Sequence, residues 1–236
     1  MNIEYKRFES EHYIFYFEPN SLADQEIEEI AKEQENCFQS ICNTLGITFT
    51  EKICYYLMDS PEKVGILFGG NDPINAFAVL GENKIYAVYN PDVKCIGFHE
   101  DTHLISATLG IPQSEFLLEG LAMFFDKTWW GLQNERWGCY YKTKSQDISI
   151  KSMLETKDFY SFDCMISYPI AGAFIQFLID RYGLERFKTL YQYPGSDYIN
   201  TFESIYPASF SDIESAFWCE MLSIEIDIAQ IEKLLI

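Results

Sequence analysis

The sequence predicts an α+β fold in which a small mixed sheet with helices comes first and a mostly helical part follows. Up to about residue 90, runs of aromatic and β-branched residues alternate with helical apolar patterns. Beyond that point nearly every apolar pattern has the helical period. The length of 236 residues suits one domain or two small subdomains and suffices for a sizeable core. We therefore expect an α/β subdomain over residues 1–90 and a helical subdomain over residues 91–236.

The first ninety residues predict the order strand, helix, strand, helix, strand, strand. Gly46 follows the first long helical pattern, as a glycine that ends a helix does. The tripeptide Asp59-Ser60-Pro61 is typical of the start of a short helix. The expected elements are a strand at His12–Glu18, a helix at Leu22–Leu45, a strand at Thr48–Met58, a helix from Pro61 to about Leu67, and strands at Ala76–Leu80 and Lys84–Tyr89.

After residue 90 the pattern predicts helices separated by short breaks. Gly110 and Pro112 separate the first two helices, and Gly183 ends a later one. The stretch Trp137–Lys151 is polar and aromatic, so we expect an irregular segment there with one short β element. The expected helices span Asp92–Leu109, Pro112 to about Thr128, Lys151–Thr156, Ser167–Tyr182, Leu184–Tyr191, Asn200–Ile205 and Ser211–Leu235.

Two of the three histidines lie four residues apart in the segment Gly97-Phe98-His99-Glu100-Asp101-Thr102-His103-Leu104. Positions i and i+4 of a helix share one face, so both imidazoles can bind the same metal ion. Glu100 then lies where a carboxylate can act on a water at that metal. The alternative is that His99 and His103 are two surface histidines on an ordinary helix. We expect the third histidine, His12, to be structural or on the surface.

A third metal ligand is predicted in the apolar segment Phe116–Phe125, which contains Glu119. A carboxylate buried among apolar side chains is costly unless it is paired or bound to a metal. Two histidines and one carboxylate, with a fourth position open, are typical of a catalytic zinc site. Glu115 remains the alternative ligand, although acids at the start of a helix are also favoured by its dipole. The expected cofactor is one Zn²⁺ per chain.

The composition excludes several classes of function. The formal net charge is −19, from 36 acidic and 17 basic residues, so no basic face is available for nucleic acid or an anionic membrane. No signal-peptide pattern opens the sequence and no window approaches 18 uncharged apolar residues, so we expect a cytoplasmic protein. The seven cysteines include no C-x-x-C pair, which argues against a thiolate zinc site.

These motifs resemble those of the gluzincin metallopeptidases, and within them the peptidase MA-like family. The resemblance covers about residues 75–220 and rests on four segments: His-Glu-Asp-Thr-His at 99–103, Glu-Gly-Leu-Ala at 119–122, Ser-Tyr-Pro-Ile-Ala-Gly-Ala-Phe at 167–174, and a helix that ends in Tyr182-Gly183. It implies a zincin-like fold with an active-site cleft between the two subdomains. It also implies a zinc metallopeptidase whose partner is a peptide or protein substrate.

Carried over by position, the resemblance assigns zinc binding to His99, His103 and Glu119 and the general base to Glu100. It also assigns to Tyr168 a hydrogen bond to the oxyanion, whereas the alternative is an ordinary core or surface tyrosine. The Gly-Ala-Met-Glu-Asn signature of the aminopeptidase branch is absent, so we expect an endopeptidase.

Thermolysin-like enzymes have an acid four residues after the glutamate ligand, and this chain has Met123 there. Asp126 is the remaining candidate for an acid that supports the ligands.

Two other functions remain open at this stage. The first is a catalytically inactive zincin-fold module that binds a peptide or protein, although a pure binding site has no use for Glu100. The second is an acidic interaction protein whose histidine motif arose by chance, which metal content would test. In the enzyme, Lys84–Tyr89 is expected either to border the cleft and pair with an extended peptide, or to be an ordinary paired strand.

Overall fold

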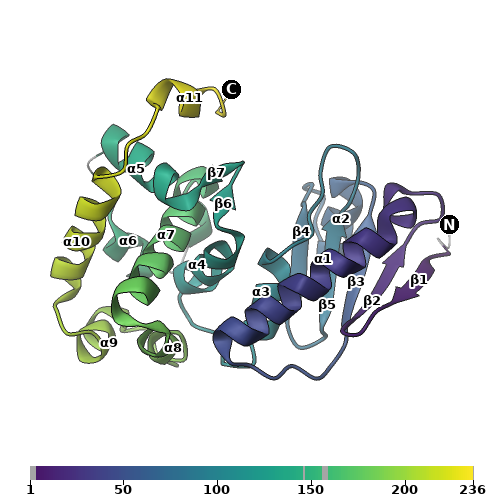
Figure 1. Ribbon diagram of the computed structural model, residues 1–236, viewed down its shortest axis with the longest axis horizontal. Coiled ribbons are helices and arrows are strands. Elements are labelled where there is room, and N and C mark those ends of the chain that lie inside the picture. The colour runs from purple at the N-terminus through teal and green to yellow at the C-terminus, as the bar shows by residue number, and fades with distance from the viewer. Residues whose placement is uncertain (1–3, 146, 156–158, 236) are drawn as a thin grey trace. The chain divides into compact units, whose positions relative to one another are not determined.

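The computed structural model describes residues 4–145, 147–155 and 159–235. The chain divides into two compact units, which we call unit 1 (Met1–Thr108) and unit 2 (Leu109–Ile236). The division along the sequence therefore falls after the histidine motif, whereas the change in sequence pattern predicts a boundary at residue 90. The predicted α+β class, with a small mixed sheet in the N-terminal part, is confirmed (Figure 1).

Unit 1 contains a five-stranded mixed sheet. In spatial order its strands are β1 (Lys6–Glu9), β2 (Tyr13–Phe17), β3 (Ile53–Met58), β5 (Lys84–Val88) and β4 (Ala76–Val79). The three central strands are parallel, and the two outer strands pair antiparallel to their neighbours. The sequence did not predict β1. The expectation that Lys84–Tyr89 borders a cleft is wrong, because β5 is paired on both sides and β4 forms that edge.

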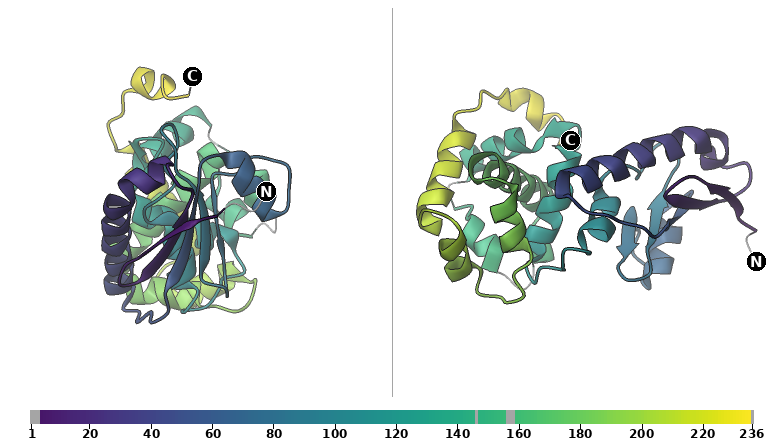
Figure 2. Two further views of the ribbon diagram at one scale, coloured as in Figure 1. Left: turned by 90° about the vertical axis from the view of Figure 1, so that its right-hand side faces the viewer. Right: turned by 60° about the horizontal axis from the view of Figure 1, so that its bottom comes forward.

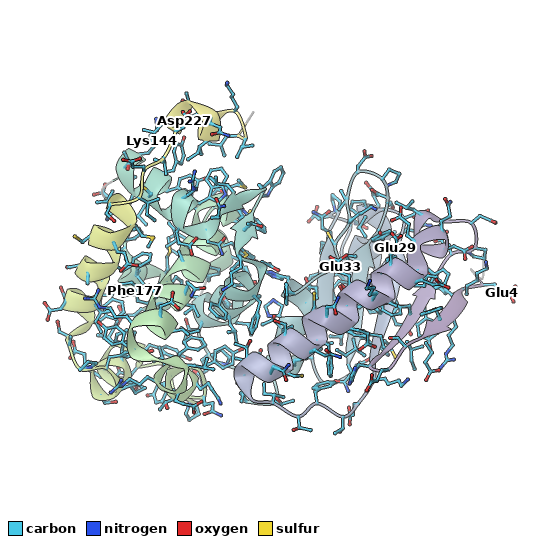
Figure 3. The ribbon with its side chains drawn as sticks, viewed as in Figure 1. Glu4, Glu29, Glu33, Lys144, Phe177 and Asp227 are labelled. Carbon is cyan, nitrogen blue, oxygen red and sulfur yellow. The ribbon has the colours of Figure 1, made fainter. Side chains whose placement is uncertain are left out.

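Helix α1 (Leu22–Leu45) has the predicted bounds and lies along one face of the sheet (Figures 1 and 2). The Ser21 side chain caps its start by accepting from the Asp24 amide, and Gly46 ends it with a φ of 65°. Every second residue of β2, such as Tyr13 and Phe15, is buried on this side. The outward face of α1 is acidic and exposed, as Glu29 and Glu33 show (Figure 3).

The other face of the sheet carries a row of stacked rings. Tyr16, Tyr56, Tyr86 and Phe77 are cross-strand neighbours, with ring centroids 4.7, 4.7 and 5.0 Å apart along the row. Such cross-strand aromatic pairs stabilise a sheet. Helix α2 (Pro61–Phe68) covers part of this face through Val64, which belongs to a buried cluster with Met58 and Val88.

Helix α3 (His99–Ser106) is shorter than the predicted span of 92–109. The Asn90 side chain accepts hydrogen bonds from the amides of Asp92 and Val93, at 3.0 and 2.8 Å, which makes a turn in place of a helical start. Lys94 then forms a bridge with Tyr89, and Gly97 has a φ of 117°. The helix can begin only after these extended residues.

Unit 2 is mainly helical and also contains a two-stranded hairpin of β6 (Thr128–Trp129) and β7 (Leu132–Gln133). All four tryptophans, 129, 130, 137 and 218, lie in unit 2. Among the described residues, none of the helices combines the length and apolar character that a membrane span requires. The helices are α4 (Glu115–Asp126), α5 (Asn134–Lys144), α6 (Ile150–Glu155), α7 (Cys164–Tyr182), α8 (Leu184–Tyr191), α9 (Tyr198–Ile205), α10 (Phe210–Leu222) and α11 (Ile228–Glu232).

Two expectations for unit 2 are corrected, and one further element was not expected. The segment expected to be irregular contains α5, which buries Trp137 and Tyr140. The expected helix over Ser211–Leu235 is two helices, because Asp227 caps α11 by accepting from the Gln230 amide. The β6–β7 hairpin was not expected; its two turn residues have positive φ, as such tight turns require. Thr156, at the end of another expected helix, lies outside the described residues.

Helices α4 and α7 cross closely because glycines stand where they approach. A Cβ at Gly120 would lie 2.8 Å from the Ile175 side chain. A Cβ at Gly172 would lie 2.6 Å from the Cβ of Met123 and from the Asn134 side chain. Real Cβ atoms do not approach so closely, so the backbones could not keep this separation with larger residues. This packing fixes α4 within unit 2.

Gly172→Ala is expected to lower the free energy of unfolding by about 1–3 kcal/mol, because the new methyl group overpacks the crossing. Gly138→Ala is the matched control, since it is also buried in a helix but its Cβ would lie 3.6 Å from the Met221 sulfur, an ordinary contact. Alanine should there be neutral or stabilising by up to about 1 kcal/mol. Denaturant unfolding measures both, and equal effects would contradict the packing argument.

Candidate metal centre

Helix α3 of unit 1 presents both motif histidines on one face. The ring centroids of His99 and His103 lie 5.0 Å apart, with the planes at 86°. His103 is 9 % exposed, and His99 and Glu100 are half-buried. The helix geometry predicted from the four-residue spacing is therefore present, with Glu100 one residue beyond the first histidine.

Helix α4 of unit 2 holds Glu119 among apolar side chains. Glu119 is 5 % exposed and lies between the buried residues Leu117 and Leu121. The hydroxyl of Tyr160 donates a 2.8 Å hydrogen bond to Glu119 Oε1. Glu115, four residues earlier, is half-buried and accepts from the Phe159 amide at 3.1 Å. One short segment, the 3-10 turn Phe159–Ser161, is thus hydrogen-bonded to both Glu115 and Glu119 of α4.

One group of three ligand-type side chains among the described residues could hold a metal ion: His99, His103 and Glu119. Each offers one ligand atom, and these atoms all lie within 4.8 Å of one another. The group comprises the three ligands predicted from the sequence and includes neither Glu115 nor Asp126. Two ring nitrogens and one carboxylate oxygen suit a borderline cation such as zinc.

Asp101 faces the interior of unit 1. It is 0 % exposed, and its carboxylate accepts hydrogen bonds from the Tyr13 hydroxyl and, at 2.9 Å, from the Gln34 side chain. Burial raises the pKa of Asp101 well above its usual range and the charge of Glu100 adds to this, while the two donors act in the opposite direction. This residue was not singled out by the sequence.

His12 has a structural role, as expected. Its Nδ1 lies 2.6 Å from Glu35 Oε2, and its ring stacks on Phe38 with centroids 3.9 Å apart. Burial raises the pKa of Glu35, but hydrogen bonds from the amide and ring of His12 and from Ser10 outweigh it, so that the net pKa is lowered. His12 belongs to a polar contact on the surface of unit 1 and not to the metal group.

The sequence predicted a catalytic role for one tyrosine of unit 2, Tyr168, and did not predict the contact of another, Tyr160. Tyr168, the residue carried over from the family, lies in the second turn of α7 and stacks on Trp129 with ring centroids 5.4 Å apart. Its role at the oxyanion stays a prediction. Tyr160, whose hydroxyl contacts Glu119, was missed. It is one of sixteen tyrosines and belongs to no spaced motif, so nothing in the local sequence distinguishes it.

Comparisons with known proteins give little further support. No protein-family model matches the chain, and no curated protein matches it. Among solved structures, it is similar to the crystal structure of an aminopeptidase N family protein from Idiomarina loihiensis, with 9% sequence identity and a TM-score of 0.39. The similarity covers 98% of this chain but only 46% of that chain. A likeness at this level carries no argument about the function of this chain.

The choice between Glu119 and Glu115 as a ligand can be tested by elemental analysis of purified protein. We expect one metal ion per chain in the wild type and in Glu115→Ala. In Glu119→Ala the affinity should fall by more than the roughly 10–100-fold that changes outside the ligand set cause. Retention of the metal by Glu119→Ala together with its loss from Glu115→Ala would assign the ligand to Glu115.

Proposed function

We propose that the chain is a zinc metallopeptidase of the gluzincin type, with a zincin-like arrangement and endopeptidase activity. The observation that carries this proposal is the group of His99, His103 and Glu119, with Glu100 in the same turn of α3 as His99. A structural zinc site is normally closed by four protein ligands, whereas three ligands leave a position open for catalysis.

The donor set fits the proposed metal. Neutral imidazoles and a carboxylate are ordinary zinc ligands, and a metal ion would add to the Tyr160 hydrogen bond in compensating for the burial of the Glu119 carboxylate. When bound, zinc supplies Lewis acidity that polarises a carbonyl oxygen and makes water acidic near neutral pH. Tyr160 would orient the Glu119 carboxylate through its hydrogen bond, as residues outside the ligand set commonly do.

The role of Glu100 is to move one proton. Its carboxylate takes the proton from the water whose oxygen forms the new bond to the scissile carbonyl carbon. As the C–N bond breaks, Glu100 delivers that proton to the leaving amine nitrogen. The products are a carboxylic acid and an amine, and Glu100 returns to its starting state. Tyr168 is proposed to donate a hydrogen bond to the oxyanion.

The edge of the sheet supports a peptide as the substrate. Within the described part of the chain, strand β4 pairs with β5 alone and forms an edge of the sheet, where an extended chain can add. It also packs beside α3 in unit 1, the helix that carries both histidines. A peptide added to β4 would extend the sheet by one strand, so we propose that β4 takes the role expected of Lys84–Tyr89.

Glu100→Gln should retain the bound metal and lower the rate of peptide cleavage by on the order of 10²–10⁴-fold, because the amide cannot accept the proton. Glu33→Gln is the control, since this residue makes the same chemical change on the exposed face of α1. Metal content and turnover of a mixed peptide library measure both. If wild type binds metal but cleaves nothing, the inactive binding module is the better function.

Substitutions at Tyr160 and at Tyr168 should affect different quantities, metal affinity in the first case and kcat in the second. Tyr160→Phe removes the donor to Glu119 and is expected to weaken metal binding by about 10–100-fold. Tyr168→Phe should leave the metal affinity unchanged and lower kcat by about 10²–10³-fold, the usual cost of losing one oxyanion donor. Metal titration and steady-state kinetics on each variant measure the difference. Unchanged kcat in Tyr168→Phe would remove that residue from the mechanism.

A further inference from the structure

The start of α3 has no side-chain cap. Phe98 occupies the N-cap position and makes no side-chain capping hydrogen bond, and the helix has only eight residues. A short helix without a cap has little intrinsic stability, so other parts of the fold must determine where it begins and how it is rotated. In unit 1, a buried side chain of α1 determines where α3 begins and how it is rotated.

Gln34 binds the chain at the point where α3 begins. Its Oε1 accepts a 2.6 Å hydrogen bond from the Gly97 amide, and its Nε2 donates to the Gly97 carbonyl at 3.1 Å and to Asp101 Oδ2 at 2.9 Å. Gln34 is 0 % exposed, so these bonds form without competition from water. Both the oxygen and the nitrogen of the amide are used, which fixes its orientation.

The second contact of Gln34 reaches the back of the histidine helix. At about 100° per residue, Asp101 lies about 200° around the helix from His99 and equally far from His103. It therefore projects from the face opposite to the two imidazoles. The single hydroxyl proton of Tyr13 in β2 is shared between the same carboxylate oxygen and the backbone carbonyl of Gln34, whose oxygen lies 3.1 Å from the hydroxyl. A rotation of α3 would break these bonds.

We propose that Gln34 is a positioning residue for the metal centre, acting through Gly97 and Asp101, with Tyr13 completing the contact. This inference rests on the proposed function, because these hydrogen bonds can position a metal centre only if His99 and His103 bind metal. Gln34 touches neither the metal nor the substrate. It holds the start and the rotation of α3, and thereby the direction in which both imidazoles project.

The test compares zinc affinity in full-length variants by competition with a chromophoric chelator. Gln34→Met keeps the length of the side chain and removes its three hydrogen bonds, so the dissociation constant for zinc should rise by on the order of 10-fold or more. Val64→Ala is the control, because Val64 is also fully buried in unit 1 but packs with Met58 and Val88. It should lose stability and keep the wild-type zinc affinity.

Hydrogen exchange of the amides in α3 gives a second measurement that needs no metal. Gln34→Met should speed exchange in residues 97–106 more than Val64→Ala does at equal global stability. Tyr13→Phe removes a single hydroxyl and should give the same changes to a smaller degree. This variant therefore tests the positioning role if Gln34→Met fails to fold.

Wild-type zinc affinity together with control-like exchange in the Gln34 and Tyr13 variants would overturn the positioning role. Absence of zinc from the wild type would instead overturn the proposed function.

Discussion

The burial of one carboxylate organises the core of unit 1. Asp101 is removed from water, and such a group is tolerated only when hydrogen bonds compensate for the lost hydration. Its donors come from β2 and α1, which are adjacent in sequence to each other but far from α3. The sheet, its covering helix and the histidine helix therefore have to fold together for these two hydrogen bonds to Asp101 Oδ2 to form. The face of α3 that carries His99 and His103 lies opposite to that contact.

Unit 2 also contains a buried carboxylate, that of Glu119, in a different environment. Glu119 lies in the apolar interior of a helical unit, where the Tyr160 hydroxyl donates a hydrogen bond to it. The close crossing of α4 and α7 leaves no room to move the carboxylate toward water by shifting the helix. A cation is the natural compensation for a carboxylate held in this way. Asp101 Oδ2 accepts hydrogen bonds from two neutral donors of unit 1, whereas Glu119 belongs to the group of three side chains that could hold a metal ion.

Much of the fold and of the candidate site could be predicted because it depends on local sequence. The bounds of α1 follow from Ser21 and Gly46, and the histidine pair follows from helical spacing alone. What failed depends on tertiary structure or on turn chemistry. The Asn90 turn shortened α3, and the pairing order placed β4 rather than β5 at the edge. Tyr160, Gln34 and Tyr13 could not be predicted, because their roles come from contacts more than 20 residues away and no sequence spacing encodes them.

The uneven distribution of tryptophan gives unit 2 an optical signal of its own. Every tryptophan belongs to unit 2, whereas the stacked row across the sheet of unit 1 consists of three tyrosines and one phenylalanine. Fluorescence excited at the red edge of absorption, where tyrosine is silent, therefore reports on unit 2 alone. The far-ultraviolet dichroism of the backbone, by contrast, comes from the helices and strands of both units. Non-coincidence of the two signals during denaturation would show that the units unfold as separate cooperative blocks.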